Sequence, residues 1–538
     1  MSYAYTQLLY CLHPSLEVSA ADQMRFIFME DISDNEPLKW GDSFDKLSDE
    51  RKQELRVRLL TWTPEQATME RLGPFFFERL NGLEVYWLAA CALAGADNDP
   101  TEVAHRLVTH NFNEKYSFRG FSSLHLEGAI LDGAYLQHAT LFLVWLTAAR
   151  LQNAQLSSAN LAGAHLEGAN LSNSQLPSAV LAGTRLDRVN LTGANLEGAN
   201  LSKAHLESGN LSNANLDWSD LTSAQLRDAD LHGAHIERAN LSGADLERAD
   251  LRKACLDHSD LDGANLEQAN LSEVSAQRAS LRMARLQNSS LYRGTLEHVN
   301  LFGAHLEGAN LIQIHLNDAD LRLTVLDSST RLNEAVLTGV SLDQAILGNT
   351  NLSDVEWGIV PLLGDEWAAN KSYGYGHWQK PSLYRAKQYQ AAARAYRMLA
   401  INLQSQGIAK ASDHYSYRCQ VMHRKHLWHQ RHWGGYLWQS FLSLSTGYGY
   451  RLWRIIAAYG LIVVIFAALY LIFGQEPLNW RTARDTLQVS FNAVHGRVIF
   501  VQFQLGTWPS WLETFESIIG IGIEAIFVAA LIQKLFSR

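Results

Sequence analysis

The sequence predicts a solenoid that is followed by a helical membrane module, and three observations support this prediction. A leucine recurs at every fifth position through the middle of the chain, from Leu126 to Leu326. A basic segment follows, and two long runs almost free of charge lie beyond it, at 455–473 and 517–532. The chain has 538 residues, 47% hydrophobic and 19% charged, which is ordinary globular composition and excludes disorder and collagen.

The five-residue repeat is the strongest signal in the sequence. Only Ile236 and Ala276 replace leucine between 126 and 326, and a small residue, most often Ala, precedes each leucine by two positions. A period of five matches neither the 3.6 of a helix nor the 2.0 of a strand. A solenoid whose turn is a multiple of five residues is the architecture that remains.

The unit A-(N/D/x)-L-x-x resembles the repeat of the pentapeptide-repeat family. The resemblance implies a right-handed quadrilateral β-helix over 116–360, with four repeats per coil and with the leucine and small-residue columns inside. After Leu326 the leucines resume at Leu332, one residue out of step, which predicts a bulge near 328–331. The open ends of such a rod need covers. We expect a helical N-terminal cap over 1–115 at one end and the segment near 357–370 at the other.

Acidic residues follow the leucine on alternate repeats, which places them on two opposite faces of a twenty-residue coil. One column contains Glu127, Glu167, Asp187, Glu207, Glu247, Glu267, Glu307 and Asp327. The opposite column contains Glu197, Asp217, Glu237, Asp257 and Glu297. Aligned carboxylates attract Lys- and Arg-rich surfaces, so this pattern predicts a basic protein partner on the rod. The simpler alternative is a solvated face that keeps the rod soluble.

The last quarter of the chain has the pattern of a membrane domain with two spans. The run 455–473 has no charge over nineteen residues, near the roughly twenty that span a bilayer. The run 517–532 is interrupted only by Glu524. Basic residues before the first run and after the second predict that both outer flanks are cytoplasmic. We therefore divide the C-terminal part into a basic linker with a TPR-like helix pair, 361–450, and a membrane domain, 451–538.

A short amphipathic helix and an extended loop, 482–509, lie between the two runs and predict a re-entrant segment. This arrangement resembles the two-transmembrane ion-channel domain of a subset of bacterial pentapeptide-repeat proteins. The resemblance implies a homo-oligomer, by analogy a tetramer, that conducts ions across the bacterial inner membrane, with the N-terminus, solenoid and C-terminus in the cytoplasm. A carboxylate inside a span is costly and usually functional, and filters use backbone carbonyls. The candidate pore residues are therefore Glu524, Gln502, Gln504, Gly506, Gly520 and Gly522.

No catalytic or cofactor motif is present: the sequence has no P-loop, GxSxG or HExxH. The four cysteines lack CxxC spacing, and His423, His426, His429 and His432 recur every three residues, which distributes them around a helix. We predict no enzyme, no cofactor, no metal site and no nucleic-acid partner. Three functions remain: an ion channel whose cytosolic rod senses or binds a partner, a non-conducting membrane-anchored scaffold such as a defence effector, and a DNA-mimicking rod that acts on a DNA-binding enzyme, as in the gyrase-binding branch of the family.

Overall fold

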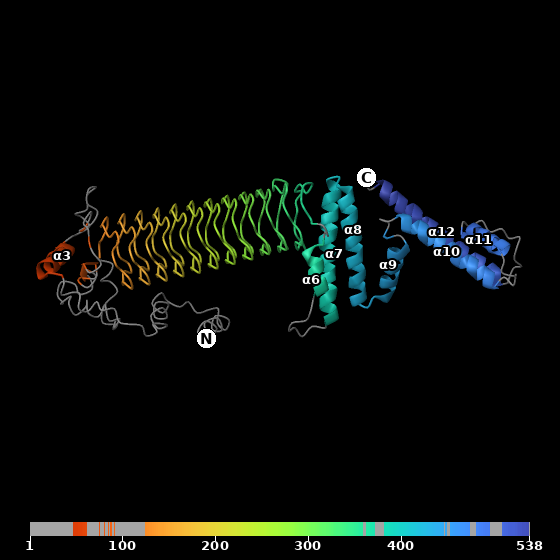
Figure 1. Cartoon of the computed structure of the whole chain (residues 1–538), viewed down its shortest axis with the longest axis horizontal. Helices are drawn as coiled ribbons and strands as arrows, with labels where there is room; N and C mark the ends of the chain where they lie inside the picture. Colours follow the sequence, from red (N-terminus) through yellow and green to blue (C-terminus); the bar gives the residue numbers. More distant parts are fainter. Residues whose placement is uncertain are drawn as a thin grey trace.

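The protein is a long rod with a group of helices beyond its C-terminal end (Figure 1). This computed structural model describes residues 47–61, 75, 80, 84–85, 87–88, 91, 124–358, 362–371, 381–445, 447–448, 452–473, 480–494 and 508–536. The rod occupies residues 124–358. The helices are α3 (Asp49–Thr61), α6 (Gly364–Lys371), α7 (Pro381–Ser405), α8 (Ala409–His429), α9 (Trp433–Ser445), α10 (Leu452–Phe473), α11 (Trp480–Val494) and α12 (Trp508–Phe536).

Each coil of the rod has four five-residue sides, and each side is joined to the next coil by one parallel β-bridge. The bridges connect residues twenty apart, such as His165 with Arg185 and Asn190 with Asn210. Successive parallel coils therefore lie about 4.8 Å apart, the usual spacing of paired strands. This regular stacking confirms the predicted β-helix.

The corners of the coil are β-turns that satisfy their own backbone groups. The amide of Ala129 donates to the Leu126 carbonyl within one turn, at 3.1 Å. Non-glycine residues occupy the left-handed region at the third turn position, for example Arg188 with φ 56°. That conformation is uncommon for residues with a Cβ. Its cost is offset because the Arg188 amide donates to the Glu207 carbonyl of the next coil at 2.9 Å.

The leucine column and the small-residue column fill the inside of the rod, as predicted. Leu211 and Ala214, for example, are both 0% exposed. Residue size is compensated between neighbouring coils. Val189 is followed by Gly209 in the same column, and a Cβ added to this glycine would lie 3.4 Å from a Val189 γ-methyl group.

The predicted one-residue bulge is confirmed by the change of register after Val325. His305 bridges to Val325, twenty residues on, whereas Asn310 bridges to Arg331, twenty-one residues on. Asp327 closes the bulge, because its carboxylate accepts hydrogen bonds from the Ser329 amide at 3.1 Å and the Gly308 amide at 3.0 Å. The Ser329 hydroxyl contributes most to lowering the pKa of Asp327, to about 2. The inserted residue thus leaves the ladder intact beyond it.

Helices lie at both ends of the rod, α3 at the N-terminal end and α6 to α8 at the C-terminal end (Figure 1); most of the predicted N-terminal cap, 1–115, lies outside the described residues. At the N-terminal end, the amide of Leu80 donates to the Ile130 carbonyl at 3.0 Å. At the C-terminal end, the Gln406 side chain accepts from the Leu352 amide at 2.9 Å and donates to the Thr350 carbonyl at 2.6 Å. The last coil therefore finds hydrogen-bond partners in the helical unit instead of presenting an open edge.

Helices α7 and α8 form the helix pair that the sequence predicts. The Ser412 hydroxyl of α8 donates to the Ala400 carbonyl of α7 at 2.8 Å. His426 is buried, and its Nδ1 lies 2.7 Å from the Ala386 carbonyl, so this histidine belongs to the helix-pair core. Of the other histidines in the repeat, His423 stacks on His426 with ring centroids 6.2 Å apart, His429 stacks on Tyr389 of α7 at 5.3 Å, and His432 lies beyond the end of α8.

The two runs that the sequence predicts as transmembrane helices lie within α10 and α12. These helices pack with α11, whose Ser490 hydroxyl donates to the Val463 carbonyl of α10 at 2.9 Å. Over the described residues, however, no helix combines the length and the apolar character that crossing a bilayer requires. The described structure therefore does not support the predicted membrane-spanning domain.

Candidate interaction surfaces

The acidic column that starts at Glu127 lies beside histidines and arginines on the same face of the rod. We call it the paired acidic column. His125 Nδ1 lies 2.7 Å from a Glu127 oxygen, and Arg185 Nε lies 3.1 Å from Glu167. The other ion pairs or histidine contacts of this column are His165–Glu167, His205–Glu207, Arg227–Glu247, Arg248–Glu247, Arg285–Glu267 and His305–Glu307. Arginines therefore compensate three of its eight carboxylates, those of Glu167, Glu247 and Glu267, which weakens its attraction for a basic partner.

Two acids of the paired column interact with each other. Burial raises the pKa of Glu207, and a hydrogen bond with the neighbouring Asp187 carboxyl raises it further. A raised pKa means that the charged form of Glu207 is disfavoured on the folded rod.

The opposite column lies apart from the basic side chains that pair with the first, and we call it the open acidic column. Its members are Glu197, Asp217, Glu237, Asp257 and Glu297. Four of them accept hydrogen bonds from uncharged donors: for example, the Glu237 amide donates to Asp217 at 2.8 Å, and the Ser275 hydroxyl donates to Asp257 at 2.7 Å. Within the described parts of the chain, no ion pair involves any of these five carboxylates. Arg238, which borders the column, lies over the Trp218 ring at 4.6 Å instead.

The open acidic column extends over five coil steps, or about 24 Å at the usual spacing of paired strands. Two unit charges about 4 Å apart in water repel by only about 1 kcal/mol. The hydrogen bonds to the carboxylates offset repulsion of this size, so the stacked backbone can hold the charges in line. The result is a straight, rigid array of negative charge on one face.

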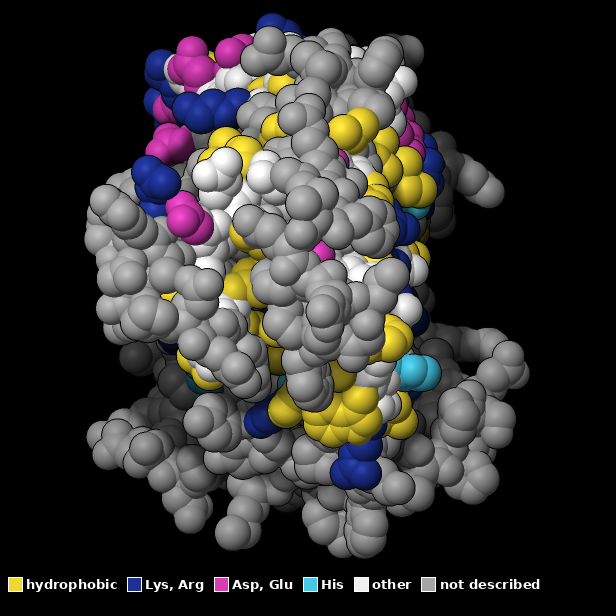
Figure 2. All heavy atoms as spheres, turned by 90° about the vertical axis from the view of Figure 1, so that its right-hand side faces the viewer, with side chains coloured by type: hydrophobic (Ala, Val, Ile, Leu, Met, Phe, Trp, Pro, Cys, Tyr) yellow, Lys and Arg dark blue, Asp and Glu magenta, His cyan; other side chains and the backbone are white. Residues whose placement is uncertain are grey.

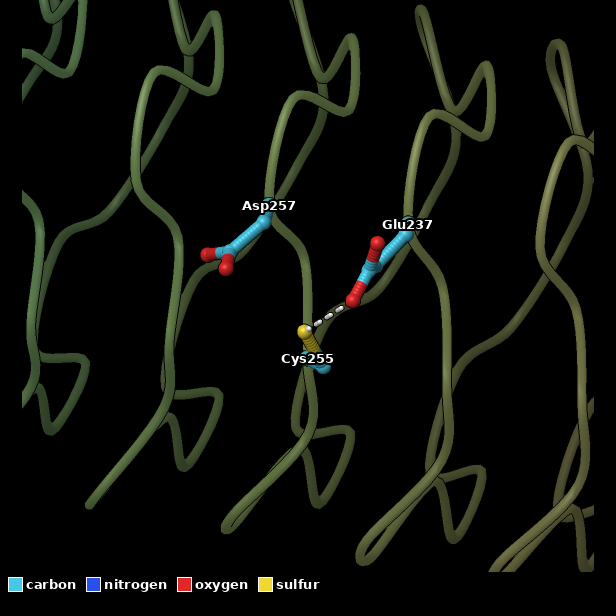
Figure 3. A group of neighbouring side chains, drawn as sticks. All are labelled: Glu237, Cys255 and Asp257. Atoms are coloured by element: carbon cyan, nitrogen blue, oxygen red, sulfur yellow. Dashed lines mark hydrogen bonds between the residues drawn. The ribbon is translucent and has the colours of Figure 1, made fainter.

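Glu237, Cys255 and Asp257 are the one group of potential metal ligands among the described residues. One donor atom of each lies within 4.8 Å of the others, and Cys255 Sγ donates to Glu237 at 3.4 Å (Figure 3). Burial raises the pKa of the Cys255 thiol to about 11, which keeps it protonated at neutral pH. Figure 3 shows the Asp257 carboxylate turned toward the following coil, away from Cys255. The three donors do not converge on one point, and we assign no metal to them.

The candidate pore residues are only partly within the described structure. Glu524 is half-buried on α12. Gly520 packs directly against α11, where an added methyl group would overlap the Val494 carbonyl, whereas Gly522 has open space around it. Gln502, Gln504 and Gly506 lie outside the described residues. Their role in a filter stays a prediction.

The fully buried carboxylate of α12 is Glu516, which the sequence analysis did not single out. It is 0% exposed and accepts a hydrogen bond from the Tyr470 hydroxyl of α10 at 2.9 Å and another from the Ser490 hydroxyl of α11. Glu516, Gly520 and Glu524 are spaced four residues apart and share one stripe of the helix. That spacing is the signal that could have identified Glu516, which lies just before the apolar run.

The rod and its repeat define a class of protein, the β-helical solenoids built from five-residue units. The sequence matches the family described as pentapeptide repeats in eight copies over residues 149–330. HetL, a pentapeptide repeat protein involved in heterocyst differentiation regulation from the cyanobacterium Nostoc sp., is 30% identical, and the match covers 40% of this chain and 90% of HetL with a TM-score of 0.25. The chain belongs to the pentapeptide-repeat family.

Two further solved structures show similarity over the repeats. The pentapeptide repeat protein Rfr23 from the cyanobacterium Cyanothece 51142 is 28% identical, covering 21% of this chain and 90% of Rfr23, with a TM-score of 0.21. QnrB1, a plasmid-mediated fluoroquinolone resistance protein, is 20% identical, covering 33% of this chain and 88% of QnrB1, with a TM-score of 0.22. Among curated proteins, no sequence matches the chain.

Proposed function

We propose that this protein is a non-enzymatic binding protein whose rod presents the open acidic column to a basic protein partner. The observation that carries the proposal is the difference between the two acidic columns. Arginines on the rod itself pair with several carboxylates of the paired column, whereas those of the open column accept only neutral donors. An array of uncompensated charge steers a complementary partner and fixes its register.

The rigidity of the rod favours this use. Every carboxylate of the open column projects from a backbone that is hydrogen-bonded to the coils before and after it, as at Glu237, whose carbonyl accepts from the Trp218 amide at 2.9 Å. A partner that docks there does not have to order a loop, and this preorganisation lowers the entropic cost of binding. The partner we expect is a protein surface or segment that carries lysines and arginines in a line.

The experiment compares two triple variants of the full chain with the same change of net charge. D217N/E237Q/D257N removes charge from the open column, and the control E167Q/E247Q/E267Q removes it from the paired column. Binding of fluorescent decalysine at about 0.1 M salt is measured by anisotropy. We expect the open-column variant to bind about tenfold more weakly and the control less than threefold, because salt screens charges on the far face over about 10 Å. Equal weakening in both variants would show that only net charge matters.

A second function, a membrane channel or a non-conducting membrane anchor, is favoured by the exposed apolar side chains of α10 and α12. Among the described side chains, those more than half exposed are Ile456, Leu461, Val464, Ile472, Trp511, Phe515, Ile518, Ile521 and Val528. Apolar surface of this extent requires cover by lipid or by further copies of the chain. A channel requires a homo-oligomer, since two spans cannot enclose a conduit, and its partners are then the lipid bilayer and ions.

Current across a planar bilayer tests the channel function directly. If Glu524 lines a water-filled axis, Glu524→Gln should lower the preference for cations over anions while assembly is retained. The control is Glu513→Gln, which lies earlier on the same helix. A wild-type chain that inserts but carries no current would favour the non-conducting anchor. A chain that does not associate with the bilayer would exclude both the channel and the anchor, without affecting the proposal for the rod.

A further inference from the structure

Helix α9 turns its apolar side away from the protein. Its most exposed large side chains are Trp433 at 53%, Leu437 at 65%, Trp438 at 57% and Leu444 at 80%. They are spaced four, one and six residues apart, which places them on one face of the helix.

The polar side chains of α9 lie on the inner side. Ser443 is 8% exposed, and Gln439 and Ser440 are half-buried. This is the reverse of the arrangement on a helix that faces water, where the apolar stripe packs against the core. The outward face is therefore suited to an environment less polar than water.

Aromatic contacts order the start of this face. Trp428, near the end of α8, lies with its ring centroid 4.9 Å from that of Trp433 and 4.8 Å from that of Tyr436. Further along α9, the rings of Trp438 and Phe441 are stacked at 5.8 Å. The rings pack against one another and so form a defined surface, with three exposed indoles. Indoles favour the boundary between hydrocarbon and water, because the ring is apolar and its N–H is polar.

Positive charge lies beside these indoles. Arg424 of α8 and Arg431 of the α8–α9 turn have no carboxylate partner within the described structure. The one acidic residue of α8 and α9 is Asp413, in the second turn of α8, far along the helix from Trp428. Figure 2, which views the molecule from its helical end, shows hydrophobic side chains gathered low on this face with Lys and Arg beside them.

We propose that the outward face of α9, with Trp428, Arg424 and Arg431, is a docking surface for an anionic lipid bilayer. The helix would lie in the headgroup region, with its apolar side chains toward the acyl chains and the arginines on lipid phosphates. A second copy of the chain is a less suitable occupant, because a twofold contact through this face would bring the arginines of both copies together. The proposal uses neither the open acidic column nor conduction.

Hydrogen–deuterium exchange of the full chain, with and without vesicles, reports on α9 locally. Vesicles of phosphatidylcholine are compared with vesicles that contain 30% phosphatidylglycerol. We expect exchange in 433–445 to slow at least fivefold with the anionic vesicles and much less with the neutral ones, while exchange in α7 does not change. No slowing in α9 with either vesicle would overturn the proposal. Slowing that depends on protein concentration without lipid would also overturn it, in favour of a second copy.

Two variants and a control complete the test. W433S/L437S/W438S should lose the lipid-dependent slowing, and R424Q/R431Q should lose the difference between anionic and neutral vesicles. The control, L383S/Y384S/I401S, removes exposed apolar side chains of α7 instead and should behave as wild type. If W433S/L437S/W438S still floats with vesicles but has lost the lipid-dependent slowing of exchange in α9, another part of the chain also contacts lipid and the assignment of α9 still holds. If W433S/L437S/W438S keeps the lipid-dependent slowing of exchange in α9, the proposal that this face docks on the bilayer is wrong.

Discussion

The Arg394 guanidinium forms two parallel hydrogen bonds to the Asp343 carboxylate, from Nε at 2.9 Å and from Nη2 at 2.8 Å. Arg394 belongs to α7 and Asp343 to one of the last coils, so this fork joins the helical unit to the end of the rod. The Asp343 side chain is only 10% exposed. The pair is therefore shielded from water on the carboxylate side, which strengthens it relative to a surface pair.

Replacing Arg394 by Gln should lower the free energy of unfolding by about 1.5–3 kcal/mol, because a nearly buried carboxylate loses two charge-assisted hydrogen bonds. The matched control is Arg248→Gln. Arg248 makes the same fork to Asp228, but both side chains are close to half exposed, and water screens such pairs so that they contribute little to stability. Thermal unfolding followed by circular dichroism measures both. Equal losses would show that burial of Asp343 does not matter.

The pKa of Asp365 predicts that mild acid stabilises the C-terminal cap. Burial raises this pKa to about 6, while the Leu342 amide, which donates to the carboxylate at 2.6 Å, and Arg322 partly oppose the shift and Asp343 adds to it. Since the folded-state pKa exceeds that of the unfolded chain, the folded state gains stability as the pH falls below about 6. The gain is fully present below the ordinary pKa of 3.8 and is lost as the pH rises through 6. It totals about 3 kcal/mol.

Asp365→Asn should therefore be more stable than wild type at pH 7 and approach it near pH 4.5, because the amide keeps the acceptor and has no charge to bury. Unfolding curves at several pH values give the difference, in which the titration of the other acids cancels. Asp49→Asn, at a fully exposed side chain, should show no such trend. A constant difference between Asp365→Asn and wild type would contradict the raised pKa.

The leucine column predicts a sharp contrast between neighbouring positions. Leu211→Lys should destabilise the rod by several kcal/mol, because a charge would enter a column without water. Ser212→Lys should be nearly neutral, since this side chain lies at the surface and its hydroxyl bonds only to the Asn210 side chain. Chemical unfolding of the two variants measures the contrast. Similar midpoints for both would refute the inward position of Leu211.

Val189 and Gly209 should be coupled, because the valine γ-methyl group fills the space above the glycine. Gly209→Ala alone should cost about 1–3 kcal/mol through crowding, and Val189→Ala alone should cost about 1–2 kcal/mol through the cavity that it leaves. The double variant restores the Ala–Ala stacking of neighbouring coils and should be more stable than the sum of the single losses predicts. A double-mutant cycle by thermal unfolding measures the coupling. Strict additivity would show that the two residues do not share this space.

Much of the rod could be predicted from the sequence, because its rules are local. The five-residue period fixes which side chains face inward, and the displacement from Leu326 to Leu332 was enough to place the bulge. The partners of the acids were harder to predict. Arg285 and Glu267 are eighteen residues apart and meet only because one coil lies on the next. Once a twenty-residue coil is assumed, an arginine eighteen residues after an acid is a usable signal of an ion pair. No arginine follows an acid of the open acidic column at that spacing, so this column could have been recognised from the sequence.

The sequence by itself determined that this protein is a solenoid of stacked five-residue units with helices after it, since a period of five residues fits neither a helix nor a strand. Only the tertiary structure decided which acidic column has arginine partners, that Glu516 and not Glu524 is the fully buried carboxylate of α12, and that α9 turns its indoles outward. Hydrophobicity along the chain shows that a helix needs an apolar environment. Whether that environment is the protein core or something outside depends on contacts between residues far apart in sequence, and these exist only in the folded chain.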